Sequence, residues 1–273
     1  MSTLIIKNGK AVNQESLVSC LGLCGSVSVF ESMCAYGGVI FKLDEHLVRL
    51  QESAKSVGLK PPLAKNRLRV QLKGALKLSC KKEAFIRLSV LGDDVFIFVK
   101  DKKKYASDIY RRGVAVGFSA ALKSCSCSSR PEAKSSNFLN SIMGHLDNPD
   151  QSFFEVLFLG SDGYVKEGRI SNIFCVKQNV LSTPPASGIL CGITRNFVLE
   201  CARCLGLNWQ ETEITRHNIY SADEVFLTNT SGGIIPVREV DSRVIGQGRP
   251  GKVTSRLIKQ FKEDVRQYIT RES

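Results

Sequence analysis

The sequence predicts an α+β fold in two domains, and three observations support that prediction. Short apolar runs bounded by glycine-containing turns are typical of β-hairpins. Longer segments repeat apolar residues every three or four positions, as amphipathic helices do. A polar stretch rich in Ser and Cys, with a proline, covers residues 123–133 and has the composition of a linker. We therefore expect a small N-terminal α+β domain over 1–122 and a larger C-terminal domain over 134–273.

The first domain is expected to consist of meandering strands with two helices packed on them. Asn8-Gly9 is a turn dipeptide between apolar runs, so a hairpin opens the chain. We expect Asp44 to cap the first helix, which places Leu47 and Leu50 on one apolar face. The remaining elements expected here are strands over 26–33, 39–41, 84–91, 95–99 and 114–122, and a second helix over 65–78.

The second domain is expected to mix strands with three helices. Gly192 precedes a helical pattern, and the chain ends in a long amphipathic helix that begins at Lys252. The helices are expected over 135–146, over 193–205 and from 252 onward, and the strands over 153–159, 170–176, 180–182, 209–214, 225–230 and 235–240.

Composition and charge argue against several classes of function. The chain of 273 residues is 43% hydrophobic and 23% charged, which is ordinary for a globular protein. No apolar run is long enough for a membrane span, and the first residues lack a signal-peptide profile, so we expect a cytoplasmic protein without membrane contact. The net charge of +12 is spread rather than clustered, which predicts a basic surface and no nucleic-acid partner.

The ten cysteines give no sign of a disulfide framework or a metal centre. Only Cys125 with Cys127 and Cys201 with Cys204 are close in sequence, and no second pair has zinc-ribbon spacing. Reduced thiols and no metal are expected.

Five features have the chemistry of a phosphate-bearing cofactor site. Glu167 is an acid beside a turn, suited to hold a protonated ring nitrogen. Gly192–Thr194 and the turn 228–233 offer backbone N–H groups to an anion, and Arg49 would add a guanidinium. Lys134 is a candidate nucleophile. Each also fits an ordinary role, as a surface charge, a helix cap or a turn.

Taken together, these residues resemble the class IV (fold type IV) pyridoxal-phosphate enzymes. That family includes branched-chain aminotransferases, D-amino acid transaminases and aminodeoxychorismate lyases. The likeness covers nearly the whole chain and rests on several short pieces in the family's order. These pieces are Phe30-Glu31, Leu43–Leu50, Lys134–Leu139, Glu167–Phe174, Thr183-Pro184, Ile189–Arg195, Ala222–Thr230 and Pro236-Val237.

The resemblance implies roles for particular residues. Lys134 would hold pyridoxal 5'-phosphate covalently and carry the proton between the substrate and the cofactor, and Glu167 would hold the pyridine nitrogen. The phosphate would be bound by Arg49, Ile193, Thr194 and Thr230, and the substrate by Phe30, Arg87 and Ser231. The family fold has a small α+β domain and a larger, barrel-like α/β domain with the cofactor between them, usually in a homodimer.

Departures from the family pattern leave the substrate open. Many members have Gly-Asp-Gly where this chain has Ser26–Ser28, and Phe138 stands near a position where branched-chain enzymes usually have Tyr. Arg87 and the segment Thr183–Pro185 resemble the branched-chain enzymes.

Our leading hypothesis is an aminotransferase acting on a branched-chain-like amino acid and a 2-oxo acid such as 2-oxoglutarate. The alternatives are an aminodeoxychorismate lyase, which releases pyruvate and 4-aminobenzoate, and a D-amino acid transaminase. From other classes, a cofactor-holding protein with little turnover and a nucleic-acid binder also remain.

Overall fold

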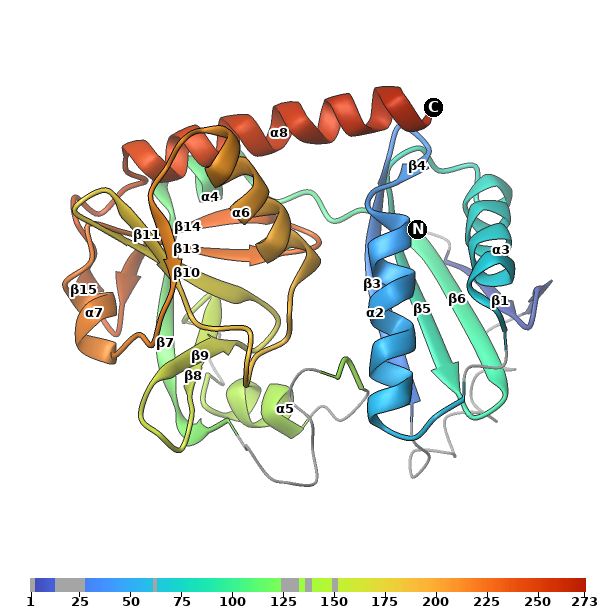
Figure 1. The fold of residues 1–273 in the computed structure, drawn as a ribbon, viewed down its shortest axis with the longest axis horizontal. Coiled ribbons are helices and arrows are strands. Elements are labelled where there is room, and N and C mark those ends of the chain that lie inside the picture. Colours follow the sequence, from blue (N-terminus) through green and yellow to red (C-terminus); the bar gives the residue numbers. More distant parts are fainter. Residues whose placement is uncertain (1–2, 13–27, 61–62, 124–132, 136–138, 149–151) are drawn as a thin grey trace. The chain divides into compact units, whose positions relative to one another are not determined.

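The computed structural model describes the chain except for residues 1–2, 13–27, 61–62, 124–132, 136–138 and 149–151. Two compact units make up the chain (Figure 1). Unit 1 comprises Met1–Lys103, Ala133–Ser136 and Arg266–Ser273, and unit 2 comprises Lys104–Glu132 and Asn137–Val265. Most of the predicted linker and two residues of the altered Ser26–Ser28 segment lie outside the described residues, so the predicted domain boundaries stay predictions.

Unit 1 contains an antiparallel six-stranded sheet in the order β2-β1-β6-β5-β3-β4. The predicted opening hairpin is confirmed, and both Asn8 and Gly9 have the positive φ values, 48° and 84°, that its tight turn requires. The elements are β1 (Leu4–Lys7), β2 (Lys10–Ala11), β3 (Ser28–Tyr36), β4 (Val39–Ile40), β5 (Ala84–Leu91), β6 (Asp94–Asp101), α2 (Leu43–Ser56) and α3 (Lys65–Leu78).

The two helices cover one face of this sheet (Figure 1). Because side chains alternate along a strand, Met33 of β3 and Leu88 of β5 face the helices and join their core. Phe30 and Arg87 occupy the alternate positions of the same strands and belong to the opposite face. The predicted amphipathic faces of both helices are confirmed, since Leu47, Leu50, Leu68 and Leu72 are fully buried.

Asp44 does not cap α2, contrary to the prediction from sequence. The helix begins at Leu43, and its N-cap residue is Lys42, which has a φ of 52° and accepts no side-chain cap bond. Asp44 lies in the first turn, where it forms ion pairs with Lys65 and Arg69 of α3. A carboxylate in the first turn still favours the helix dipole, and here it also joins the two helices.

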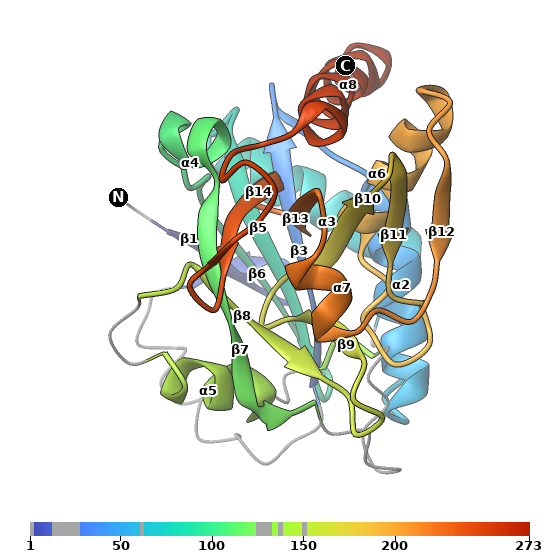
Figure 2. The same cartoon turned by 90° about the vertical axis from the view of Figure 1, so that its left-hand side faces the viewer.

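Unit 2 contains a nine-stranded sheet in the order β12-β11-β10-β13-β14-β7-β8-β9, with β15 paired to β14. Its strands curl around rather than lie flat (Figure 2). The strands are β7 (Val114–Leu122), β8 (Glu155–Leu159), β9 (Val165–Gly168), β10 (Asn172–Lys177), β11 (Val180–Thr183), β12 (Trp209–Glu211), β13 (Glu224–Asn229), β14 (Gly233–Val240) and β15 (Arg243–Val244). The helices are α4 (Ser107–Arg112), α5 (Leu139–Leu146), α6 (Ile193–Cys204), α7 (Arg216–Tyr220) and α8 (Lys252–Glu272).

The strand β7 lies between β14 and β8 and runs parallel to both. The prediction from sequence groups residues 114–122 with the first domain, because they follow that domain's hairpins in the chain. The hydrogen bonds of β7 join it to the sheet of unit 2. Four short elements, α4, α7, β9 and β15, were not predicted.

Aromatic pairs join neighbouring strands and neighbouring helices of unit 2. On one face, Phe174 of β10 stacks on Phe226 of β13 with ring centroids 4.9 Å apart. Phe197 of α6 meets Phe261 of α8 edge-on at 5.2 Å. The residues of α8 from Arg266 onward belong to unit 1, where the ring of Tyr268 meets that of Phe41 edge-on at 5.0 Å.

Among the described residues, no helix is long and apolar enough to cross a membrane.

Candidate active site

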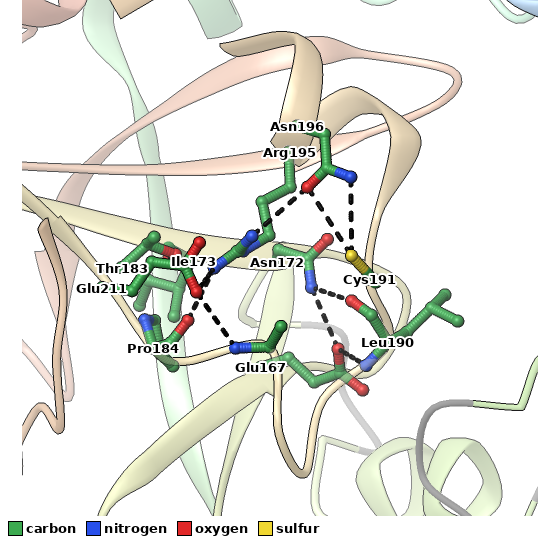
Figure 3. Close-up of polar contacts among 11 residues, drawn as sticks. Glu167, Asn172, Ile173, Thr183, Pro184, Leu190, Cys191, Arg195, Asn196 and Glu211 are labelled. Carbon is green, nitrogen blue, oxygen red and sulfur yellow. Dashed lines mark hydrogen bonds and ion pairs between the residues drawn. The ribbon is translucent and has the colours of Figure 1, made fainter. Parts of the chain in front are cut away.

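The carboxylate of Glu167, on the short strand β9, accepts hydrogen bonds from three donors, of which Asn172 and Leu190 are drawn in Figure 3. Its Oε1 accepts from Nζ of Lys123 at 2.5 Å, and its Oε2 accepts from Nδ2 of Asn172 and the backbone N–H of Leu190, both at 3.0 Å. The side chain is 13% exposed. Charge-assisted bonds to both oxygens fix the orientation of the carboxylate, so Glu167 is not an ordinary surface acid.

Asn172 connects this acid to the segment that precedes α6. Besides Glu167, its Nδ2 donates to the carbonyl oxygen of Leu190 at 2.9 Å (Figure 3). A Cβ on Gly192 would collide with Oδ1 of Asn172. The φ of Gly192 is −68°, which any residue adopts. Glycine is therefore required here for close approach and not for backbone conformation.

The start of α6 has the properties of an anion site. The predicted helix is confirmed, and its N-cap, Gly192, makes no side-chain cap bond. The N–H groups of Ile193 and Thr194 belong to the first turn, where a helix has no carbonyl acceptors of its own for them. The side chain of Arg195 is buried and anchors this turn, because its Nη2 donates to the carbonyl oxygen of Pro184 at 2.8 Å and lies 3.1 Å from Oε2 of Glu211 (Figure 3).

The turn that holds Thr230 and Ser231 lies at the same end of the sheet as Asn172. Strands β10 and β13 are antiparallel, and Asn172 is directly opposite Thr228, two residues before Thr230. Within this turn, Oδ1 of Asn229 accepts from the N–H of Gly232 at 2.8 Å. Oγ1 of Thr228 is buried and has no hydrogen-bond partner within the part of the chain that the structure describes.

A buried acid fixes the turn that follows Glu167. Glu155 of β8 accepts from the N–H of Ile170 at 3.2 Å and from Oγ of Ser171 at 3.1 Å. Burial raises the pKa of Glu155 above its ordinary value, against the hydrogen bonds and the nearby Arg169. A Cβ on Gly168 would lie 2.9 Å from Glu155, so glycine is needed at this turn as well.

In unit 1, Lys134 pairs with the edge of β3 beside Phe30. The carbonyl oxygen of Lys134 accepts from the N–H of Phe30, and its own N–H donates to Oγ of Ser53 on α2, both at 3.0 Å. Nζ of Lys134 lies 4.7 Å from the centroid of the Phe30 ring, and Cζ of Arg87 lies 3.9 Å from the same centroid. Three predicted site residues thus meet at one aromatic ring. Burial lowers the pKa of Arg87.

Arg49 forms part of a buried cluster with Glu31 and His46. Glu31 is fully buried and accepts two hydrogen bonds from Arg49 and one from Nδ1 of His46, each at 2.7 Å. Burial alone would raise the pKa of Glu31, but the charge and hydrogen bonds of Arg49, with those of His46, lower it to about 2. Burial lowers the pKa of His46, an effect that Arg49 and Lys134 reinforce and Glu31 opposes.

Three residues of this arrangement were missed from the sequence: Lys123, Asn172 and, as the partner of Arg49, Glu31. Glu31 had a signal, because an acid in the middle of an apolar strand is costly unless it is paired. Asn172 lies within the segment Glu167–Phe174 that carries the family resemblance, but its residue type and spacing do not single it out as a site residue. Lys123 follows β7 within a polar stretch and gives no local signal.

A metal centre is not formed by the described residues, which contain no group of three or more His, Cys, Asp or Glu side chains placed to hold an ion.

Comparison with known proteins decides the family. The model of the family described as "Amino-transferase class IV" matches residues 28–240. The chain belongs to the class IV aminotransferases. A Methanocaldococcus jannaschii protein provisionally named a branched-chain-amino-acid aminotransferase is 34% identical over 95% of each chain. The Bacillus licheniformis D-alanine aminotransferase is 32% identical over 84% of each chain.

The fold also matches solved class IV structures. The T.th. branched-chain amino acid aminotransferase with pyridoxamine 5'-phosphate superposes with a TM-score of 0.89 at 31% identity, over 96% of this chain and 93% of that one. The same protein has been solved with N-(5'-phosphopyridoxyl)-L-glutamate and with 4-methylvaleric acid. The predicted fold type IV is confirmed. As a class IV aminotransferase, the chain is an enzyme whose cofactor is pyridoxal 5'-phosphate and whose substrates are amino and 2-oxo acids.

Proposed function

We propose that this class IV aminotransferase transfers the amino group of a branched-chain amino acid to a 2-oxo acid such as 2-oxoglutarate. The observation that carries the assignment of the site is the fixed carboxylate of Glu167, joined through Asn172 to the uncapped start of α6. The substrate class is supported by the relatives with branched-chain names. These relatives favour transamination over the lyase and over a role without turnover.

The residues present fit pyridoxal 5'-phosphate. An ionised carboxylate has about four acceptor sites, and described donors occupy three on Glu167. That leaves room for the N–H of a ring nitrogen. Gly192 allows a close backbone approach, and the first turn of α6 supplies N–H groups and a helix dipole for a phosphate. The amine of Lys134 supplies the nucleophile that this cofactor requires.

When bound, pyridoxal phosphate supplies an electron sink that stabilises negative charge at the substrate's Cα. We propose that Glu167 holds the proton of the ring nitrogen, which strengthens that sink. Lys134 would hold the cofactor covalently, and its amine would carry a proton between Cα of the substrate and the C4′ carbon of the cofactor. Arg49, the N–H groups of Ile193 and Thr194, and Thr230 bind the phosphate.

We assign the substrate carboxylate to the face of the unit 1 sheet that is not covered by α2 and α3. Arg87 has the planar guanidinium that binds a carboxylate with two parallel bonds, and Phe30 packs against it. Phe30 also provides an apolar surface for a branched side chain. Ser231, beside the proposed phosphate ligand Thr230, completes the substrate residues.

A homodimer is the proposed assembly, in the cytoplasm. Ile142, Met143 and Leu146 of α5 are 55%, 38% and 63% exposed, and Ile170 is 60% exposed. Exposed large apolar side chains favour contact with another protein surface. The six cysteines in the described part are thiols, as in proteins of reducing compartments. Light scattering on wild type and Leu146→Glu tests the assembly, since the charge is expected to dissociate the dimer.

A panel of single amino acids tests the substrate class. Purified protein loaded with pyridoxal phosphate is mixed with each L- and D-amino acid in turn, and the cofactor absorbance is followed through one turnover. We expect L-leucine, L-isoleucine and L-valine to react fastest, and 2-oxoglutarate to reverse the change. Faster reaction with D-alanine indicates the D-amino acid alternative, and pyruvate released from aminodeoxychorismate without an acceptor indicates the lyase.

Borohydride reduction of the loaded protein, followed by peptide mapping, tests the role of Lys134. The cofactor is expected on the peptide that contains Lys134, and modification at Lys123 or any other lysine would contradict the assignment.

A further inference from the structure

Lys123 is a nearly buried cation that none of the roles above uses. Its side chain is 5% exposed. Nζ lies 2.5 Å from Oε1 of Glu167 and 3.0 Å from the carbonyl oxygen of Gly188, and its backbone N–H donates to the carbonyl oxygen of Leu159 at 2.7 Å. A buried ammonium is costly unless it is paired and hydrogen-bonded. The bond to Glu167 pairs the charge of Lys123, and the bond to Gly188 fixes the position of Nζ beside that carboxylate.

The donors around Glu167 divide unequally between its two oxygens. Oε2 accepts from Asn172 and Leu190, whereas the described donors give Oε1 only Lys123. Since each carboxylate oxygen has about two acceptor sites, the remaining capacity is on Oε1. The oxygen suited to a further proton donor is thus the one that Lys123 contacts.

A positive charge at this oxygen changes how a proton is shared. A carboxylate that already accepts a charge-assisted bond gains less from taking up a proton than one without it. When such a carboxylate faces a protonated ring nitrogen, the cation therefore favours the proton on nitrogen. Without the cation, the proton moves toward the carboxylate oxygen.

We propose that Lys123 is a positioning residue that turns Oε1 of Glu167 toward the cofactor's ring nitrogen and keeps the shared proton on that nitrogen. This inference rests on the proposed role of Glu167. It assigns to a second lysine, eleven residues before Lys134, a role that is electrostatic and not covalent.

The test compares Lys123→Met, Lys123→Arg and a matched control, Lys166→Met. Lys166 is the neighbour of Glu167 on β9, is 12% exposed and pairs with Asp162 at 2.7 Å. Each protein is loaded with pyridoxal phosphate carrying ¹⁵N in the ring, and the ¹⁵N chemical shift is measured by NMR. Wild type, Lys123→Arg and Lys166→Met are expected to give the pyridinium shift. Lys123→Met is expected to move most of the way toward the unprotonated value and to bind the cofactor about tenfold or more weakly.

A second variant covers failure of Lys123→Met to fold. Lys123→Gln keeps an N–H donor for Glu167 and Gly188 but removes the charge, and it is expected to shift the ¹⁵N signal in the same direction. A pyridinium shift in both neutral variants, equal to that of Lys166→Met, overturns the proposal. Wild type that takes up no cofactor on Lys134 would instead contradict the proposed function, so the two failures are distinguishable.

Discussion

Arg49 holds Glu31 through two parallel hydrogen bonds, from Nε to Oε1 and from Nη2 to Oε2, each 2.7 Å long. Both side chains are buried, at 9% and 0% exposure. A bidentate pair of this kind fixes the plane of the guanidinium. Glu31 thus sets the orientation of the arginine that we assign to the phosphate, and Ser53, one turn further along α2, fixes the backbone of Lys134.

Replacement of Glu31 by Gln is expected to destabilise the protein strongly. The change leaves the buried charge of Arg49 without its counter-ion, and breaking one side of a buried pair costs about 3 kcal/mol of unfolding free energy. Urea unfolding measures the loss. Glu45→Gln is the control, because Glu45 pairs with Lys42 while 46% exposed, and a change within about 0.5 kcal/mol is expected there. Equal effects of the two variants would contradict the argument.

The stability of the wild type is expected to fall in acid in two stages. The pKa of His46 is below its ordinary 6.5, so its contribution is complete above pH 6.5 and is lost as the pH falls below that value. The pKa of Glu31 is lowered from 4.5 to about 2, so its contribution is complete above pH 4.5 and is lost as the pH falls toward 2. Melting temperatures from pH 7 to pH 2 should show both losses. In Glu31→Gln, the fall in melting temperature below pH 4.5 should be smaller than in wild type. If the melting temperatures of the two proteins fall in parallel there, Glu31 is not the cause of the loss of stability in acid.

Gly192→Ala is expected to weaken cofactor binding by about tenfold or more, because its Cβ would collide with Oδ1 of Asn172 and push α6 from Glu167. The backbone at Gly192 accepts alanine, so the effect is steric. Gly74→Ala on the exposed side of α3 is the control. No atom lies within 4 Å of its added Cβ, and the variant should gain about 1 kcal/mol of stability. Fluorescence titration with pyridoxal phosphate compares them, and unchanged affinity in Gly192→Ala would remove Gly192 from the site.

Arg87→Met is expected to raise the KM for the amino and 2-oxo acids by about 10- to 100-fold, the effect of losing a hydrogen-bonded charge on a carboxylate. Covalent uptake of the cofactor should persist, since Lys134 is held by Phe30 and Ser53. Arg69→Met, which removes the partner of Asp44 on α3, should leave KM unchanged. Steady-state kinetics with L-leucine and 2-oxoglutarate measure both variants, and a KM like that of wild type in Arg87→Met would exclude a role in substrate binding.

The sequence was sufficient where the signal is local. Alternation and turn residues located the hairpins around Asn8-Gly9 and between β5 and β6, and the 3.6-residue period located α2, α3, α6 and α8. The short helices α4 and α7, of six and five residues, are too short to show a period.

The electrostatic partners could not be predicted, because they depend on pairing between distant strands. Lys123 and Glu167 are 44 residues apart. They meet because β7 runs parallel to β8 and β8 pairs with β9, with register shifts in both ladders. No local pattern encodes such shifts. Glu167 itself was found because its neighbours form a motif, and its fixed orientation became visible only in three dimensions.

The contact of Tyr268 with Phe41 has a consequence for the order of events on the ribosome. Phe41 is translated well before Tyr268, the residue whose ring meets it, because the two are 227 positions apart in the sequence (268 minus 41). An N-terminal fragment ending at Lys103 therefore lacks two parts of unit 1. One is the segment around Lys134, which pairs with the edge of β3, and the other is Tyr268, whose ring packs on Phe41. Unit 1 therefore completes its packing only after the segment that carries Tyr268 has been translated.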